Sequence, residues 1–172
     1  IYTGCRSSAA SDVYKRQDLV DDFQEELQSC AIQFVDYGGQ KAFWGQCRTV
    51  KCQNDNVLVK KILETPGNRR VLVIDGGGSL ETALLGDLMA ELGRKNGWSG
   101  VVVHGAVRDT VTLGTLNFGV KALGSNPLKS RKNGEGEIDV PVQLGTVRFR
   151  PGQWVYCDED GIVVEDRELP IP

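Results

Sequence analysis

Residues 71–109, VLVIDGGGSLETALLGDLMAELGRKNGWSGVVVHGAVRD, hold two short apolar runs on either side of a helical pattern. The runs Val71–Asp75 and Gly100–His104 are rich in valine and isoleucine, which favour buried strands. The segment between them ends near Asn96 and Gly97, a typical helix stop. A strand, a helix and a strand within about 35 residues form a βαβ unit, whose two strands run parallel. This stretch predicts an α/β fold.

The rest of the chain extends this pattern on both sides. An amphipathic helix is predicted over Asp18–Ser29, and a second helix is predicted from a cap at Asn54-Asp55 to about Leu63. Further strands are predicted over Ala31–Val35, Phe43–Cys52, Gly119–Leu123, Ile138–Val142, Thr146–Phe149, Trp154–Asp158 and Ile162–Val164, with a polar loop over Ser125–Gly136. We therefore expect one α/β domain with a mixed sheet.

The first residues of the chain do not resemble a folded segment. Residues 1–17, IYTGCRSSAASDVYKRQ, show neither helical nor strand periodicity, and SSAASDVYKRQ matches one translated frame of a common transposon-based sequencing adapter. We expect 1–17 to be a non-native, disordered segment and 18–172 to be the single domain. An ordinary disordered tail is the alternative. With the native start missing, a targeting peptide is not excluded.

Composition excludes several classes of protein. The chain has 172 residues, 20 Lys and Arg against 23 Asp and Glu, and a net charge of −3. Without residues 1–17 the net charge is −5, which argues against a nucleic-acid-binding face. No apolar run approaches the roughly 18 residues that a membrane helix needs. The chain has five cysteines, and the four that lie outside residues 1–17 are scattered and form no CxxC pair, which indicates reduced, buried thiols and a cytoplasmic protein.

The single histidine, His104, limits the chemistry further. A multi-histidine metal site is excluded, and a Ser-His-Asp triad would have to use this residue. We expect His104 to be structural. Any metal must then be held by carboxylates, which suit Mg²⁺ or Mn²⁺.

The glycines of the central stretch do not form a nucleotide motif. A GxGxxG fingerprint that starts at Gly76 needs glycine at position 81, which is Glu81, and no Gly-Lys-Ser/Thr follows. Gly86 instead suggests that a helix begins here with Asp87 near its N-cap. The N–H groups around Leu88 and Met89 would then be open to an anion such as a carboxylate. A glycine that allows close packing of the helix on the sheet is the alternative.

Arg108 and Asp109 directly follow the second strand. Loops at the carboxyl ends of parallel strands form the ligand sites of α/β proteins. Arginine pairs with carboxylates through two parallel hydrogen bonds, and an aspartate oxygen is a ligand for Mg²⁺. A solvated ion pair that closes the turn is the alternative.

The stretch 71–109, together with FGVKALGSNPLKS at 118–130 and DEDGIVV at 158–164, resembles the regulator of ribonuclease activity A / 4-hydroxy-4-methyl-2-oxoglutarate aldolase family. The aldolase signature of that family is Asp, twenty residues and Arg-Asp, which fits Asp87 and Arg108-Asp109. The resemblance implies a swivelling β/β/α domain, and a homotrimer with active sites at the subunit interfaces.

The resemblance also implies roles for individual residues. The backbone of Gly86–Met89 and the side chain of Arg108 would bind a small 2-keto acid, Asp109 would bind the divalent metal, and Asp87 would act as an outer-shell carboxylate. The implied activity is metal-dependent cleavage of 4-hydroxy-4-methyl-2-oxoglutarate to pyruvate, with decarboxylation of oxaloacetate as a side activity. Asp87 and Glu91 both remain candidates for assisting proton removal. Many aldolases of the family have an acidic residue where this chain has Thr112.

The resemblance to this family also leaves two other functions to consider. One is a non-catalytic protein that binds and inhibits a ribonuclease, and the other is methylation of a quinone precursor, which the glycine pattern does not support. The run Lys129–Lys132 is expected to be a solvated loop, and Asp158–Gly161 a hairpin turn rather than a calcium loop. The three tryptophans, Trp44, Trp98 and Trp154, are too dispersed to predict a stacking platform and are expected in the core or an interface.

Overall fold

The computed structural model describes residues 16–23 and 27–170. The proposed non-native segment therefore lies outside the described residues, apart from the first two residues of α1. The helices are α1 (Arg16–Phe23), α2 (Val57–Leu63), α3 (Asp87–Lys95) and α4 (Thr110–Leu113). The strands are β1 (Gln28–Cys30), β2 (Val35–Asp36), β3 (Phe43–Lys51), β4 (Val71–Asp75), β5 (Ala83–Leu85), β6 (Gly100–Val107), β7 (Gly119–Ser125), β8 (Glu137–Ile138), β9 (Val142–Leu144), β10 (Val147–Phe149), β11 (Trp154–Asp158) and β12 (Gly161–Glu165).

The parallel centre of the sheet comes from the βαβ unit. β4 pairs in parallel with β6, with Val71 opposite Gly100, and α3 lies between them in the chain. β3 and β7 flank this pair: β3 pairs in parallel with β4, and β7 pairs in parallel with β6. The predicted parallel pairing is confirmed.

β3 joins two parts of a mixed sheet. Its first residues pair antiparallel with β11, and its last residues pair in parallel with β4. The resulting strand order is β1-β12-β11-β3-β4-β6-β7-β2, with β5 on β6 and β8 on β3 at the side. β9 and β10 form a separate antiparallel pair.

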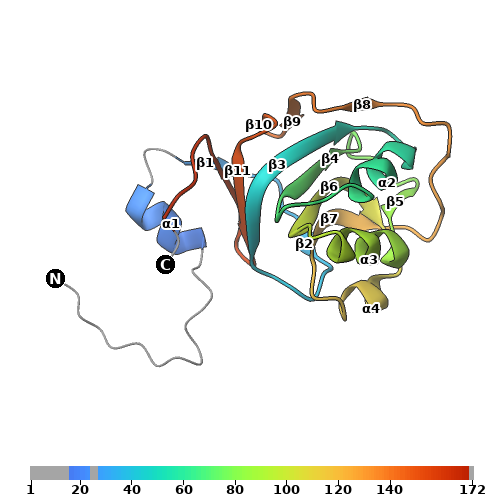
Figure 1. Cartoon of the computed structure of the whole chain (residues 1–172), viewed down its shortest axis with the longest axis horizontal. Helices are drawn as coiled ribbons and strands as arrows, with labels where there is room; N and C mark the ends of the chain where they lie inside the picture. The colour runs from blue at the N-terminus through green and yellow to red at the C-terminus, as the bar shows by residue number, and fades with distance from the viewer. Residues whose placement is uncertain (1–15, 24–26, 171–172) are drawn as a thin grey trace.

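Two cores lie on opposite faces of the central strands. Along β4 and β6, Leu72 and Val101 face α2 and α3, whereas Val73 and Val102 face β9, β10 and the β11–β12 part. This alternation is the period of a strand buried on both faces. Figure 1 shows α2, α3 and α4 gathered on one side of the sheet and α1 on the other, beside β11. The order of layers is β/β/α, as expected.

The sequence prediction fails mainly near the N-terminal end. Gln28 and Ser29, expected in a helix, lie in β1, and most of Ala31–Val35, expected as a strand, lies outside the strands. β1 pairs with β12, with Cys30 opposite Ile162, so a long-range pairing overrides the local helical pattern. α4 and β5 were not predicted, and of the strand expected over Ile138–Val142 only the two end residues lie in strands, in β8 and β9.

Other sequence expectations concern cysteines and membranes. Cys30, Cys47, Cys52 and Cys157 are free and buried, as predicted. Among the residues that the structure describes, no helix is long and apolar enough to cross a membrane.

Candidate functional site

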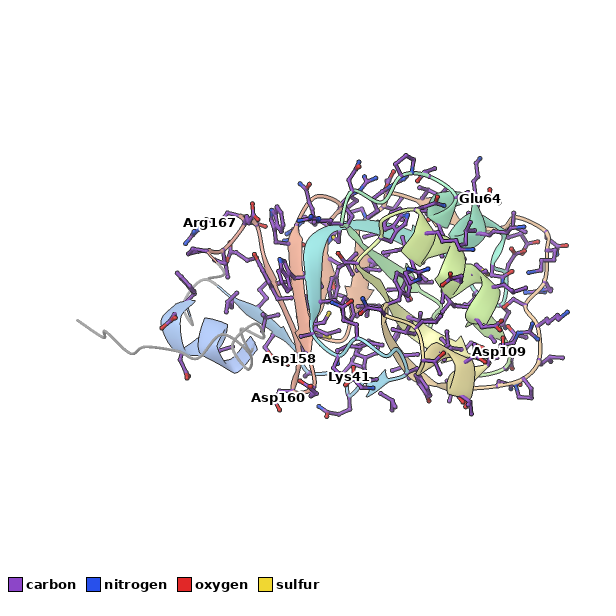
Figure 2. The ribbon with its side chains drawn as sticks, turned by 60° about the horizontal axis from the view of Figure 1, so that its bottom comes forward. Lys41, Glu64, Asp109, Asp158, Asp160 and Arg167 are labelled. Atoms are coloured by element: carbon purple, nitrogen blue, oxygen red, sulfur yellow. The ribbon has the colours of Figure 1, made fainter. Side chains whose placement is uncertain are left out.

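The carboxyl ends of β5 and β6 meet at one edge of the sheet, where α3 and α4 begin. β5 runs parallel to β6, with Leu85 opposite Val107, so the next residues of both strands emerge side by side. These residues are Gly86, Arg108 and Asp109. Asp109, labelled in Figure 2, lies at the start of α4. The pairing of β5 with β6 therefore brings together segments that are more than twenty residues apart in the sequence.

Gly86 leaves room for the two charged side chains. It is the N-cap of α3 with an extended backbone (φ −125°, ψ −172°), which any residue can adopt. A Cβ atom on Gly86, however, would lie 2.7 Å from Asp109 Oδ2 and 3.2 Å from Arg108 Nε. The predicted helix start at this glycine is confirmed. The close approach is made to Arg108 and Asp109 rather than to the sheet.

Asp109 is held in an uncommon backbone conformation. Its φ of 57° and ψ of 41° are left-handed, a region that aspartate and asparagine enter more readily than most residues. Asp109 Oδ2 accepts a hydrogen bond of 3.2 Å from the backbone N–H of Asp87 and lies 3.5 Å from Arg108 Nε. Within the described residues, Oδ1 has no hydrogen-bond partner, and the side chain is 33% exposed. One carboxylate oxygen is thus available to a ligand.

Arg108 lies between two hollows in the surface. Its backbone N–H donates to the Leu85 carbonyl (3.0 Å), which fixes the start of its side chain. The side chain contributes to a hollow of about 230 Å³ with Thr110, Ser125 and Asn126, and to a second of about 260 Å³ beneath α3. Arg108 therefore pairs with Asp109 and contributes to the lining of both hollows.

The 260 Å³ hollow is strongly cationic. Arg108 shares its lining with Lys60, Lys129 and Lys132, and no acidic residue lies among the lining residues that the structure describes. The uncharged lining comes from the N-cap residues of α2 and α3, from β5 and from α3, namely Asn56, Gly86, Ala83, Leu88, Met89 and Leu92. A hollow with four cations and no carboxylate favours an anionic ligand.

The first turn of α3 is only partly open to such a ligand. Asp87 uses its N–H on Asp109, and its own Oδ1 accepts the N–H of Leu88 at 2.8 Å. The N–H of Met89 has no acceptor in the described part of the chain, and Met89 lines the hollow. Of the two backbone N–H groups expected to be open to an anion, that of Leu88 is therefore already bonded to Asp87.

A buried carboxylate anchors the loop that carries Lys132. Asp55 is 0% exposed and accepts hydrogen bonds from the N–H groups of Val57, Asn133 and Gly134. Burial alone would raise its pKa, but these backbone donors outweigh burial and hold the pKa below its usual range. The ionised Asp55 thus ties residues 133–134 to the start of α2.

Lys132 and Asn56 meet as a result of this anchoring. Lys132 Nζ donates to Asn56 Oδ1, and Asn56 Nδ2 donates to the Leu84 carbonyl. Burial lowers the pKa of Lys132, although the nearby charge of Asp55 acts in the opposite direction. Sequence reasoning missed this pair and assigned Lys129–Lys132 to a solvated loop. That prediction is wrong for Ser130, which is buried and donates to the Ala83 carbonyl.

Glu91 is occupied elsewhere. Both of its carboxylate oxygens accept hydrogen bonds from Arg94, at 2.7 and 2.8 Å, and Lys95 lies nearby. The hydrogen bond from Arg94 lowers the pKa of Glu91. Of the two acidic candidates for proton removal, Asp87 is therefore the one whose carboxylate has no arginine partner in the described ranges, and its backbone N–H bonds to Asp109.

No ready-made metal cage is present. In the described ranges, no group of three or more His, Cys, Asp or Glu side chains is arranged around one point. Asp109 Oδ1 supplies one oxygen ligand. Mg²⁺ commonly keeps several waters and binds through one or two carboxylates plus a substrate, so this donor set fits it.

Fold and site together describe a β/β/α domain in which one edge of the sheet brings together a helix start, an Arg-Asp pair and a cationic hollow. The chain belongs to the RraA-like family (Aldolase/RraA), whose family model matches residues 16–164. That family includes both aldolases and inhibitors of ribonucleases.

Solved structures support this assignment. The chain is similar to a Geobacillus kaustophilus protein described as an S-adenosylmethionine:2-dimethylmenaquinone methyltransferase, with 46% identity over 90% of this chain and 96% of that one, and a TM-score of 0.89. It is also similar to the RNA-processing inhibitor RraA of Thermus thermophilus, with 43% identity over 91% and 94% and a TM-score of 0.87. A third similar structure is RraAS2 of Streptomyces coelicolor, with 26% identity over 80% and 73% and a TM-score of 0.66.

Proposed function

We propose that the protein is a divalent-metal-dependent aldolase that cleaves 4-hydroxy-4-methyl-2-oxoglutarate to pyruvate and also decarboxylates oxaloacetate. The observation that carries the proposal is the placement of Asp109 Oδ1, without a partner in the described chain, beside Arg108 and the cationic hollow. A purely structural Arg-Asp pair needs neither a left-handed aspartate nor a hollow lined by three lysines.

Asp109 is the residue proposed to hold the metal, Mg²⁺ or Mn²⁺. When bound, the ion supplies a Lewis acid that polarises the substrate's ketone and favours cleavage of the adjacent carbon–carbon bond. Arg108 lies next to Asp109, where its positive charge offsets the negative charge that develops on the keto-acid fragment.

The rest of the site matches a dicarboxylic substrate. The keto-acid end of the substrate is proposed to accept hydrogen bonds from the N–H of Met89 and the guanidinium of Arg108. Its distal carboxylate is proposed to lie among Lys60, Lys129 and Lys132, since the 260 Å³ hollow is continuous from Arg108 to these lysines. Both 4-hydroxy-4-methyl-2-oxoglutarate and oxaloacetate carry two carboxylates, so both satisfy this arrangement.

Asp87 is proposed to take part in removing the proton of the distal hydroxyl. Its Oδ1 is held by the Leu88 N–H, which leaves Oδ2 to accept a proton directly or through water. Loss of that proton breaks the bond between C3 and C4, with the electron pair remaining on the C3 fragment. Protonation of that fragment gives one pyruvate, and the C4 fragment is the other.

The site is proposed to be completed by a second copy of the chain in a homotrimer. Four large apolar side chains are exposed around it: Leu80 (48%), Leu88 (80%), Val111 (86%) and Leu128 (62%). Exposed apolar side chains that cluster around a polar site are typical of a subunit interface.

Pyruvate release tests the proposal. 4-Hydroxy-4-methyl-2-oxoglutarate and oxaloacetate are supplied separately, with Mg²⁺ or with excess chelator, against a blank without protein. Release that needs both protein and metal supports an aldolase. A folded protein that releases no pyruvate above the blank contradicts the proposal. It favours a non-catalytic protein that binds and inhibits a ribonuclease, in line with the Thermus relative, which is an RNA-processing inhibitor.

A further inference from the structure

A third hollow lies at the opposite edge of the parallel strands from Arg108. It has a volume of about 560 Å³, and residues 68–70 and 98–99, which precede β4 and β6, form part of its wall. β6 has eight residues, so its two ends are separated by roughly 26 Å. The hollow is therefore distinct from the Arg108–Asp109 site, and its size lies in the range of small-molecule sites.

All three tryptophans of the chain line this hollow, although their spacing in the sequence predicts no stacking platform. Trp154 on β11 lies opposite Gln46 on β3, and Trp44 is two residues from Gln46 along β3. The side chains of Trp154, Gln46 and Trp44 therefore share one face of the sheet. Trp98 comes from the loop before β6 and donates its indole N–H to the Thr65 carbonyl. The hollow is thus lined by tryptophans from three separate segments, of which Trp98 is buried (4% exposed).

Two arginines give the hollow a positive charge. Arg70 is fixed, because it donates to the carbonyls of Gly67 and Pro66 and its guanidinium lies 5.2 Å from the Trp98 ring centroid. Arg69 is exposed, and its guanidinium has no hydrogen bond or ion pair with any residue in the described ranges. Against these two cations the lining contains one carboxylate, Glu168.

Hydrogen bonds fix the backbone of Arg69, although its guanidinium has no hydrogen bond or ion pair within the described ranges. Arg69 has a left-handed φ of 61°, its N–H donates to the Gly97 carbonyl at 2.7 Å, and its carbonyl accepts from Ser99 Oγ at 2.6 Å. A Cβ atom on Gly45 would lie 2.2 Å from that carbonyl. The loop is therefore clamped over β3, and the guanidinium is presented from a fixed position.

We propose that this hollow binds an aromatic anion, a planar ring that carries a phosphate or a carboxylate. The ring stacks on the indoles of Trp44 and Trp154, and the anionic group pairs with Arg69. Aromatic rings stack on indoles through offset or edge contacts, and a guanidinium binds phosphate and carboxylate through two parallel hydrogen bonds. This site goes beyond the proposed lyase activity and does not depend on it.

Tryptophan fluorescence tests the proposal directly, because every tryptophan lines the hollow. The full chain is titrated with adenosine 5′-monophosphate and with benzoate, excited at the red edge of tryptophan absorption, where neither probe absorbs. Saturable quenching by either probe is expected, and the two together distinguish a phosphate from a carboxylate. Adenosine, which lacks the charge, is expected to bind about tenfold more weakly than its monophosphate.

Matched variants locate the binding. Arg69→Gln removes the charge but keeps an unbranched, polar side chain at the left-handed position, and it is expected to weaken quenching about tenfold. Arg148→Gln, at an exposed arginine on β10, and Arg108→Gln are expected to leave it unchanged. Quenching absent for both probes, as when a second copy of the chain covers the hollow, overturns the proposal. So does quenching that Arg108→Gln abolishes and Arg69→Gln does not.

Discussion

The backbone N–H of Asp87 donates a hydrogen bond to Oδ2 of Asp109, at 3.2 Å, and so joins the start of α3 to the start of α4. The bond occupies one oxygen of the Asp109 carboxylate and turns the other outward. It exists because Gly86 has no side chain in the space next to Asp109.

Replacing Gly86 by alanine is expected to lower pyruvate release about a hundredfold, because displacement of a reacting group by about 1 Å costs that much. The new methyl group would lie 2.7 Å from Asp109 Oδ2, so the carboxylate must move. The backbone of Gly86 suits alanine, and the melting temperature is expected to change little. Gly93→Ala on the same helix is the control, since its Cβ meets Leu63 and Phe118 in the core. It is expected to reduce stability and spare activity, and the opposite pattern would contradict this account.

Asp109→Asn is expected to abolish metal-dependent pyruvate release while the protein stays folded. Asparagine accepts the left-handed backbone of this position, but its amide is a poorer ligand for Mg²⁺ than a carboxylate. Circular dichroism and the rate of pyruvate release, measured on the same preparation, check the two parts. Turnover equal to that of the unmodified protein would show that Asp109 holds no essential metal.

Lys132→Gln is expected to raise the KM for oxaloacetate about tenfold, with a smaller change in kcat, because a charge near the distal carboxylate is lost. Glutamine can still donate to Asn56, so the loop stays in place. Lys95→Gln, at an exposed residue of α3 outside the hollow, is the control. An unchanged KM for Lys132→Gln would place the distal carboxylate elsewhere.

Asp55→Asn is expected to destabilise the fold by about 1–3 kcal/mol, because a buried carboxylate that accepts several N–H groups loses its charge. The folded-state pKa of Asp55 is lowered, so its contribution is present above its unfolded pKa of about 3.9 and is lost as the pH falls through the folded value. Urea unfolding at neutral and acidic pH measures both effects. Asp139→Asn, which removes an exposed ion pair with Arg48, should cost less than about 1 kcal/mol. Equal costs would show that Asp55 is no anchor.

Cys47 and Cys52 are expected to resist alkylation in the folded protein at about pH 8, because burial raises the pKa of each thiol to about 12. The raised folded pKa stabilises the fold below the unfolded thiol pKa of about 8.5, and this contribution is lost as the pH rises towards 12. Mass spectrometry of alkylated peptides, with and without denaturant, measures the reaction. Rapid labelling of either cysteine in the native protein would contradict this expectation.

The features predicted correctly from the sequence are those with a local cause. Val71–Asp75 and Gly100–His104 are strands because of their own β-branched residues, and their pairing follows from the helix between them. The start of α3 follows from Gly86 itself. Arg108 and Asp109 could be placed at the carboxyl edge of the sheet from the sequence because they directly follow a single predicted strand.

The missed features depend on contacts distant in the sequence. Lys132 lines the hollow because Asp55 accepts hydrogen bonds from the N–H groups of the residues that follow Lys132. No sequence motif around Lys132 or Asp55 predicts that contact. The three tryptophans meet because β3 and β11 pair across more than half of the chain. β1 forms where a helical pattern ends, because β12 supplies a partner for it.

The most direct test of the central claim is pyruvate release from 4-hydroxy-4-methyl-2-oxoglutarate as a function of added Mg²⁺, for the unmodified protein and for Asp109→Asn. Our account predicts saturable dependence on Mg²⁺ in the unmodified protein, loss of release with excess chelator, and only the blank rate for Asp109→Asn. Pyruvate release that changes neither with excess chelator nor in Asp109→Asn would contradict our account.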